Sequence, residues 1–147
     1  MVALKLAPYG FPEYVIAAAL THDVLEDTCF PEEKLRAELG EDVLEIVKAV
    51  TADDSLPWEE KKRKYIESVR RGPEGAKMVA VADKIHNIES LLMAYIEQGP
   101  ELWKKFSRGK EQKLWFENEV LKMLRETWRH PLVEEYASLL EKEKQLK

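Results

Sequence analysis

The chain has 147 residues, of which 45% are hydrophobic and 35% are charged, and its net charge is −5. This length suits one domain with one apolar core, and the negative charge gives no electrostatic argument for binding nucleic acid or an anionic membrane. A single cysteine, Cys29, excludes an internal disulfide and fits a reducing compartment. Because no apolar run approaches the ~20 residues that span a bilayer, and no signal peptide is recognisable, we expect a cytoplasmic protein.

The hydrophobic pattern is helical almost throughout the chain. Apolar residues recur at spacings of three and four, and prolines and glycines mark the boundaries between segments. We predict a helix ending near residue 7, followed by helices over residues 12–27, 31–39, 41–50, 57–71, 76–96, 109–128 and 131–144. No segment alternates as a half-buried strand does, so we expect an all-α fold in which residues 1–147 form a single domain.

The first segment that could carry chemistry is LTHDVLEDTCF, residues 20–30, which follows the apolar run VIAAAL. On a helix, residues four apart share a face, so His22 lies beside Glu26 and Asp23 lies beside Asp27. An imidazole and a carboxylate in such positions can bind one divalent cation, and the next two carboxylates can orient or deprotonate a water. The alternative is a helix end with solvated charges, which accounts for Glu26 and Asp27 better than for the His-Asp pair.

The second such segment is VAVADKIHNIESL, residues 79–91, within the longest predicted helix. Asp83 and Asn87 lie one turn apart on it, among apolar positions. An unpaired buried carboxylate is costly, so Asp83 needs a partner. A metal shared with the His-Asp pair of the first segment would supply one, and an ion pair with Lys84 or another base is the alternative. His86 lies on a different face, where we expect it to pack.

Together, these two segments resemble a known family. HDVLEDT at residues 22–28 and ADKIHN at residues 82–87 resemble the motifs of the HD-domain phosphohydrolases. More narrowly, they are similar to the hydrolase domain of the RelA/SpoT alarmone enzymes and to the small alarmone hydrolases. The stretches between the motifs follow that family's order and spacing, and the likeness covers residues 2 to about 96. The resemblance implies an HD-domain helical bundle.

The resemblance also implies an activity and a set of residue roles. The activity is hydrolysis of the 3′-pyrophosphate of ppGpp or a related nucleotide, with Mn²⁺ or another divalent metal as cofactor. On matching positions the implied metal ligands are His22, Asp23 and Asp83, the catalytic pair is Glu26 and Asp27, and the substrate-binding residues are Asn87 and Lys84. Within the catalytic pair, Glu26 is the expected activator of the attacking water.

The chain departs from the family pattern at its beginning. The family has a further ligand histidine, in a His-Pro step, just before the segment that matches residues 2–7. We therefore expect a domain that is N-terminally incomplete relative to the family, with an exposed core face that a homodimer could cover. Two alternatives follow: a degenerate, non-catalytic HD module that binds a nucleotide or a protein partner, or an HD phosphatase acting on another nucleotide such as NADPH.

Several other conspicuous residues are expected to be structural. The run KKRK at residues 61–64 follows Glu59 and Glu60, which favours a solvated, ion-paired helix face over a phosphate site. His130 precedes a proline, and we expect it in a loop or at a helix cap. The four tryptophans lie at helical positions and are expected to pack between helices.

Overall fold

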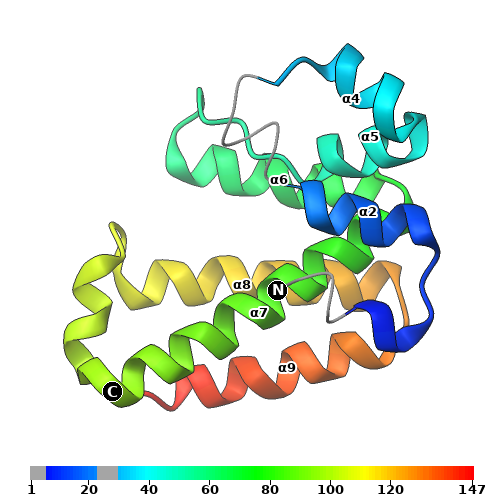
Figure 1. The fold of residues 1–147 in the computed structure, drawn as a ribbon. Coiled ribbons are helices and arrows are strands. Elements are labelled where there is room, and N and C mark those ends of the chain that lie inside the picture. Colours follow the sequence, from blue (N-terminus) through cyan, green and yellow to red (C-terminus); the bar gives the residue numbers. More distant parts are fainter. Residues whose placement is uncertain (1–5, 23–29) are drawn as a thin grey trace. The chain divides into compact units, whose positions relative to one another are not determined.

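The computed structural model describes residues 6–22 and 30–147, and Figure 1 traces its elements in chain order. They are the 3₁₀ turn η1 (Ala7–Tyr9), α2 (Glu13–Thr21), α4 (Glu32–Leu39), α5 (Glu41–Ala49), α6 (Trp58–Arg71), α7 (Glu74–Gln98), the 3₁₀ turn η2 (Gly99–Lys105), α8 (Gly109–Thr127) and α9 (Pro131–Lys144). The described residues contain no strand, so the all-α prediction is confirmed. The chain divides into two compact units, Met1–Ala82 and Asp83–Lys147, and the boundary falls inside α7.

The first unit is organised around α5, which packs against α2, α4 and α6. Its apolar residues recur with the helical period, as the sequence predicted, and most of them are buried. The buried residues of α5 are Val43, Leu44, Ile46, Val47 and Ala49, and those of α2 are Val15, Ala18 and Ala19. Burial of these side chains is the main favourable contribution to the stability of this unit.

The first turn of α7 comes very close to the core of the first unit at Gly75. A Cβ atom placed on this glycine would lie 2.5 Å from the Ile46 Cδ1 atom and 3.2 Å from a methyl group of Val15. Any larger residue would overlap with these side chains. The glycine is therefore a packing requirement of the contact between α7, α5 and α2.

The helix boundaries follow the local signals in the sequence. Pro12, Pro31 and Pro57 each stand at the N-cap of the helix that they precede. Gly40 has φ of 92°, a conformation that favours glycine, and it separates α4 from α5. The predicted starts of these helices, and the predicted ends of α4, α5 and α6, differ from the observed ones by at most one residue, the ordinary scatter at frayed helix ends. The α2 helix ends at Thr21, whereas the prediction continued to residue 27, and residues 23–27 lie outside the described part of the chain.

The second unit contains the second half of α7 together with η2, α8 and α9. Figure 1 shows α8 and α9 running antiparallel, side by side, joined by the short segment 128–130. The buried apolar residues of these two helices are Phe116, Val120, Leu121, Met123, Leu124, Leu132, Val133, Tyr136 and Leu140. The Tyr136 hydroxyl donates a 2.8 Å hydrogen bond to the backbone carbonyl of Glu117, which joins α9 to α8 inside the core.

His130 caps α9. Its Nδ1 atom accepts a 3.1 Å hydrogen bond from the Leu132 backbone N–H, and its ring stacks on Trp128 with the ring centroids 4.8 Å apart. The cap prediction for His130 is therefore confirmed.

Among the residues that the structure describes, no helix combines the length and the apolar character that crossing a bilayer would require.

Candidate functional site

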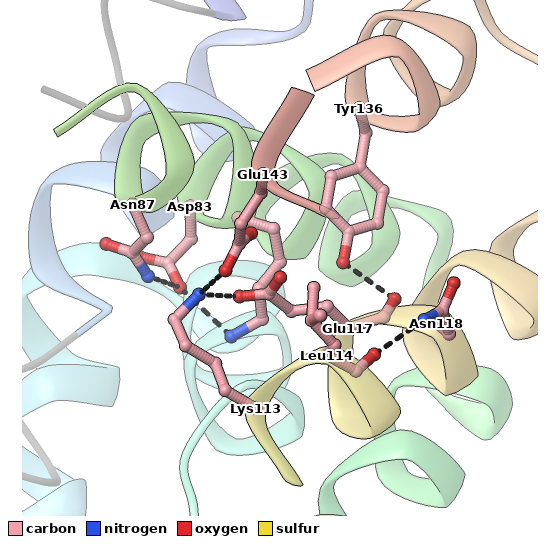
Figure 2. Close-up of polar contacts among 9 residues, drawn as sticks. Asp83, Asn87, Lys113, Leu114, Glu117, Asn118, Tyr136 and Glu143 are labelled. Carbon is pink, nitrogen blue, oxygen red and sulfur yellow. Dashed lines mark hydrogen bonds and ion pairs between the residues drawn. The ribbon is translucent and has the colours of Figure 1, made fainter. Parts of the chain in front are cut away.

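Three of the predicted site residues come together on α7, within the second unit. The Asn87 side-chain amide donates a 3.3 Å hydrogen bond to Oδ2 of Asp83, as Figure 2 shows. The Lys84 ammonium lies 3.6 Å from the same Asp83 oxygen. The ion pair with Lys84 that the sequence left open is thus present. The arrangement presents a carboxylate, an amide and an ammonium within one turn of helix.

The surroundings of this group restrict its side chains. The Asp83 side chain is 24% exposed and the Lys84 side chain only 14%. The Lys84 Nζ atom lies 4.9 Å from the centroid of the Phe116 ring, which belongs to α8. A lysine has many rotamers, and in this one the ammonium lies near both the Phe116 ring and Asp83.

His22 lies in the first unit, where it caps the C-terminal end of α2 and is half-buried. Its Nδ1 atom lies 2.7 Å from the backbone carbonyl of Ala19. A carbonyl oxygen can only accept, so Nδ1 carries the proton in this contact and the neutral ring then has its lone pair on Nε2. A histidine anchored in this way through one nitrogen is suited to bind a metal through the other.

Asp23, Glu26 and Asp27 lie outside the described residues. Among residues 6–22 and 30–147, no group of three or more histidine, cysteine, aspartate or glutamate side chains is placed to hold a metal ion. The described members of the predicted ligand set are His22 and Asp83. Each of them, an imidazole with an anchored Nδ1 and a half-buried carboxylate, is a ligand type that divalent cations accept.

A second charged group in the same unit was not predicted from the sequence. Lys113 of α8 donates hydrogen bonds to Glu117, one turn along the same helix, and at 2.6 Å to Oε1 of Glu143 on α9 (Figure 2). Glu117 is 4% exposed and Glu143 is 0% exposed. Each carboxylate has an Oε2 atom that is buried without a hydrogen-bond partner among the residues that the structure describes.

The electrostatics of this buried group, which we call the Lys113 cluster (Lys113, Glu117 and Glu143), favour an uncharged carboxyl. Two carboxylates share one ammonium, so full ionisation would leave a net negative charge in the core. Burial, reinforced by the neighbouring Glu143 and opposed by Lys113, raises the pKa of Glu117 to about 8. The sequence does carry a signal for the cluster: Glu117 lies next to Phe116 and three residues before Val120, on the apolar face of its helix.

The KKRK run forms ion pairs within the first unit. Lys61 pairs with Asp54, Arg63 with Glu59, and Lys64 with Asp53. Lys62 stands 5.9 Å from the centroid of the Trp58 ring. These contacts support the prediction of an ion-paired surface face. Nearby, a pocket of about 660 Å³ is lined by residues that include Thr51, Asp53, Lys64, Tyr65 and Ser68, and its described lining does not include His22, Asp83, Lys84 or Asn87.

Comparison with known proteins identifies the family. A family model described as an HD domain matches residues 1–108. The MESH1 guanosine-3′,5′-bis(diphosphate) 3′-pyrophosphohydrolase of Xenopus tropicalis is 39% identical over 113 residues, covering 77% of this chain and 60% of that protein. The guanosine-3′,5′-bis(diphosphate) 3′-pyrophosphohydrolase of Haemophilus influenzae is 32% identical over 96 residues, covering 61% of this chain and 14% of that protein.

Solved structures of similar fold and sequence point to the same family. The crystal structure of lmo0812 from Listeria monocytogenes EGD-e matches with a TM-score of 0.88 and 34% identity, covering 95% of this chain and 94% of that one. A structure described as a metazoan ortholog of SpoT that hydrolyzes ppGpp matches with a TM-score of 0.77 and 30% identity, covering 99% and 79%. The chain therefore spans only part of the curated relatives, while its fold agrees with the solved ones over nearly its whole length.

Proposed function

The chain belongs to the HD-domain family, and we propose that it hydrolyses the 3′-pyrophosphate of ppGpp or a closely related nucleotide. The observation that carries this proposal is its 39% identity, over 77% of its length, to a protein named for that reaction. The likeness to the structure described as a ppGpp-hydrolysing SpoT ortholog also supports it. Because the chain covers 60% of the first of these relatives, activity has to be measured on this chain itself.

The proposed cofactor is a divalent metal, which HD hydrolases require, with Mn²⁺ as the ion that we expect. His22, Asp23 and Asp83 are the proposed ligands. The anchored Nδ1 of His22 and the half-buried carboxylate of Asp83 support two of these three assignments. When bound, such an ion neutralises phosphate charge and increases the acidity of water.

The remaining roles belong to side chains that handle the water and the nucleotide. Glu26 takes the proton of the attacking water, and Asp27 assists as the second member of the catalytic pair. Asn87, which is exposed on α7, donates to the sugar end of the nucleotide, and Lys84 places its positive charge beside the phosphates. This proposal treats residues 1–147 as one functional domain in which a homodimer could cover an open core face.

The experiment that tests this function combines activity with metal content. Purified protein is loaded with Mn²⁺, and release of pyrophosphate from ppGpp is followed for the wild type and for Asp83→Ala. We expect hydrolysis in the wild type, and we expect the variant to lose both hydrolysis and the bound manganese measured by elemental analysis. An unchanged manganese content in Asp83→Ala would show that the ligand assignment is wrong.

The same material distinguishes the other functions that the motifs allow. Calorimetric titration with ppGpp, with and without Mn²⁺, separates an enzyme from a binding module. Tight binding that needs no metal and leads to no turnover would replace the hydrolase proposal with the non-catalytic module. Hydrolysis of NADPH but not of ppGpp would instead identify a phosphatase with another nucleotide substrate.

A further inference from the structure

Phe116 has no role in the proposed site, yet its ring lies against one of the residues that does. The ring is on α8 and is 7% exposed. The Lys84 ammonium, on α7, lies 4.9 Å from the ring centroid. A cation over the face of an aromatic ring is attracted by the electron density of that face, and more strongly where water is scarce. The 14% exposure of the Lys84 side chain satisfies this condition.

The lysine held by this ring also lies beside Asp83. Its Nζ atom lies 3.6 Å from Oδ2 of Asp83, and Asn87 donates to the same oxygen at 3.3 Å. One carboxylate oxygen is therefore placed between an ammonium and an amide. The ammonium belongs to a flexible side chain, and the ring that it faces belongs to another helix. The ring and the carboxylate thus contact the same ammonium.

We propose that Phe116 is a positioning residue, whose aromatic face holds the Lys84 ammonium beside Asp83. The role of this contact in hydrolysis rests on the proposed function. Losing the ring would let the lysine sample its other rotamers, so its charge would spend less time where the phosphates bind. A buried phenylalanine often serves only as core volume. If Phe116 had only that simpler role, any apolar side chain of similar size would keep both the Lys84 position and the activity.

The test uses two substitutions at Phe116 that differ in the aromatic face. Phe116→Leu keeps apolar bulk and removes the face, whereas Phe116→Tyr keeps the face. The protein is labelled with ¹³C-lysine, and the Cε–Hε signal of Lys84 is assigned by its disappearance in Lys84→Met. In the wild type and in Phe116→Tyr, we expect this signal to show an upfield ring-current shift. In Phe116→Leu, the signal should remain but lose this shift.

A second lysine–ring pair in the same unit provides a matched control. The Lys113 ammonium lies 5.4 Å from the centroid of the Phe106 ring. Phe106→Leu should move the Lys113 signal while leaving the Lys84 signal and the rate of ppGpp hydrolysis unchanged. Urea denaturation of each variant identifies any that has lost its fold.

The kinetic arm asks whether Phe116 acts through Lys84. We expect Phe116→Leu to lower kcat/KM for ppGpp about tenfold, Phe116→Tyr to remain near the wild type, and Phe116→Leu to have no further effect when Lys84 is already methionine. An unmoved Lys84 signal in Phe116→Leu, or the same loss of kcat/KM in the Lys84→Met background, would overturn the proposal. If the wild type does not hydrolyse ppGpp, the proposed function fails, and the lysine signal still decides whether Phe116 holds Lys84.

Discussion

The ammonium of Lys113 and the carboxylate of Glu143 are 30 residues apart in the chain and 2.6 Å apart in space, in the core of the second unit. The same ammonium donates to Glu117, so one cation holds two buried carboxylates and joins α8 to α9. Figure 2 shows the Tyr136 hydroxyl, on α9, donating to the backbone carbonyl of Glu117 on α8, beside this cluster. Polar contacts therefore link α8 and α9 within an otherwise apolar interface.

The raised pKa of Glu117 predicts that the free energy of unfolding falls as the pH increases. The folded protein retains the Glu117 proton up to a pH of about 8, whereas the unfolded chain releases it near its ordinary value of 4.5. Between these values the folded state binds more protons, so stability decreases across this window and levels off above it. We expect a change on the order of a few kcal/mol, measured by urea denaturation from pH 5 to pH 9.

The assignment of this effect to Glu117 is tested by substitution. Glu117→Gln should flatten the dependence between pH 5 and pH 8, because the amide does not titrate. Glu111→Gln, at an exposed position on the same helix, should keep the wild-type slope. An unaltered slope in Glu117→Gln would assign the proton uptake to another group.

Replacing Lys113 by methionine should destabilise the fold strongly. Methionine keeps most of the apolar stem but leaves two buried carboxyl groups without their shared hydrogen-bond donor and the Glu143 carboxylate without its cation, and breaking such a group costs about 3 kcal/mol or more. Denaturant unfolding at pH 8 measures the loss. Adding Glu143→Gln to Lys113→Met should recover part of it, because one uncompensated charge is removed.

An exposed ion pair gives the comparison for Lys113. The side chains of Lys104 and Glu101 are 76% and 71% exposed, and their charged atoms are 2.6 Å apart. Lys104→Met should cost less than about 1 kcal/mol, because solvent screens such pairs. If Lys113→Met costs no more than Lys104→Met, the buried cluster does not stabilise the interface between α8 and α9.

Gly75→Ala should destabilise the first unit although alanine is the better helix former. The helix preference of alanine over glycine favours the variant by about 1 kcal/mol. The added Cβ atom would stand 2.5 Å from Ile46 Cδ1, and such overpacking costs about 1–3 kcal/mol. Thermal unfolding should show a lower melting temperature for Gly75→Ala. Ile46→Val removes the obstructing methyl group, so in that background the alanine should be tolerated better.

Asn87→Ala tests the proposed contact with the nucleotide. If the amide donates to the substrate, its loss should raise KM for ppGpp about tenfold, the equivalent of roughly 1.4 kcal/mol. Steady-state kinetics with Mn²⁺ give the two parameters separately. Glu97→Ala, which removes an exposed side chain near the end of α7, should leave both parameters unchanged. A KM unaffected by Asn87→Ala would remove this residue from the substrate site.

Most of the helices could be predicted from the sequence because their signals are local. The apolar period, the prolines before α2, α4 and α6, and Gly40 together locate the starts of these helices, and the ends of α4, α5 and α6, to within a residue. The contact between Asp83 and Asn87 was also predictable, since residues four apart share a helical face. The roles of Asp23, Glu26 and Asp27 stay predictions that rest on the motif.

The sequence by itself therefore determined the all-α class, the HD-domain family and the neighbours along each helix, because these depend on spacing within short segments. Only the tertiary structure decided that the Phe116 ring lies against Lys84 and that Glu117 and Glu143 share Lys113. Helical period says which face of a helix is apolar, but it does not say which residue of another helix that face meets. Such pairings depend on how the ridges of one helix enter the grooves of the next. The contact between Lys84 and the Phe116 ring and the raised pKa of Glu117 are thus consequences of packing.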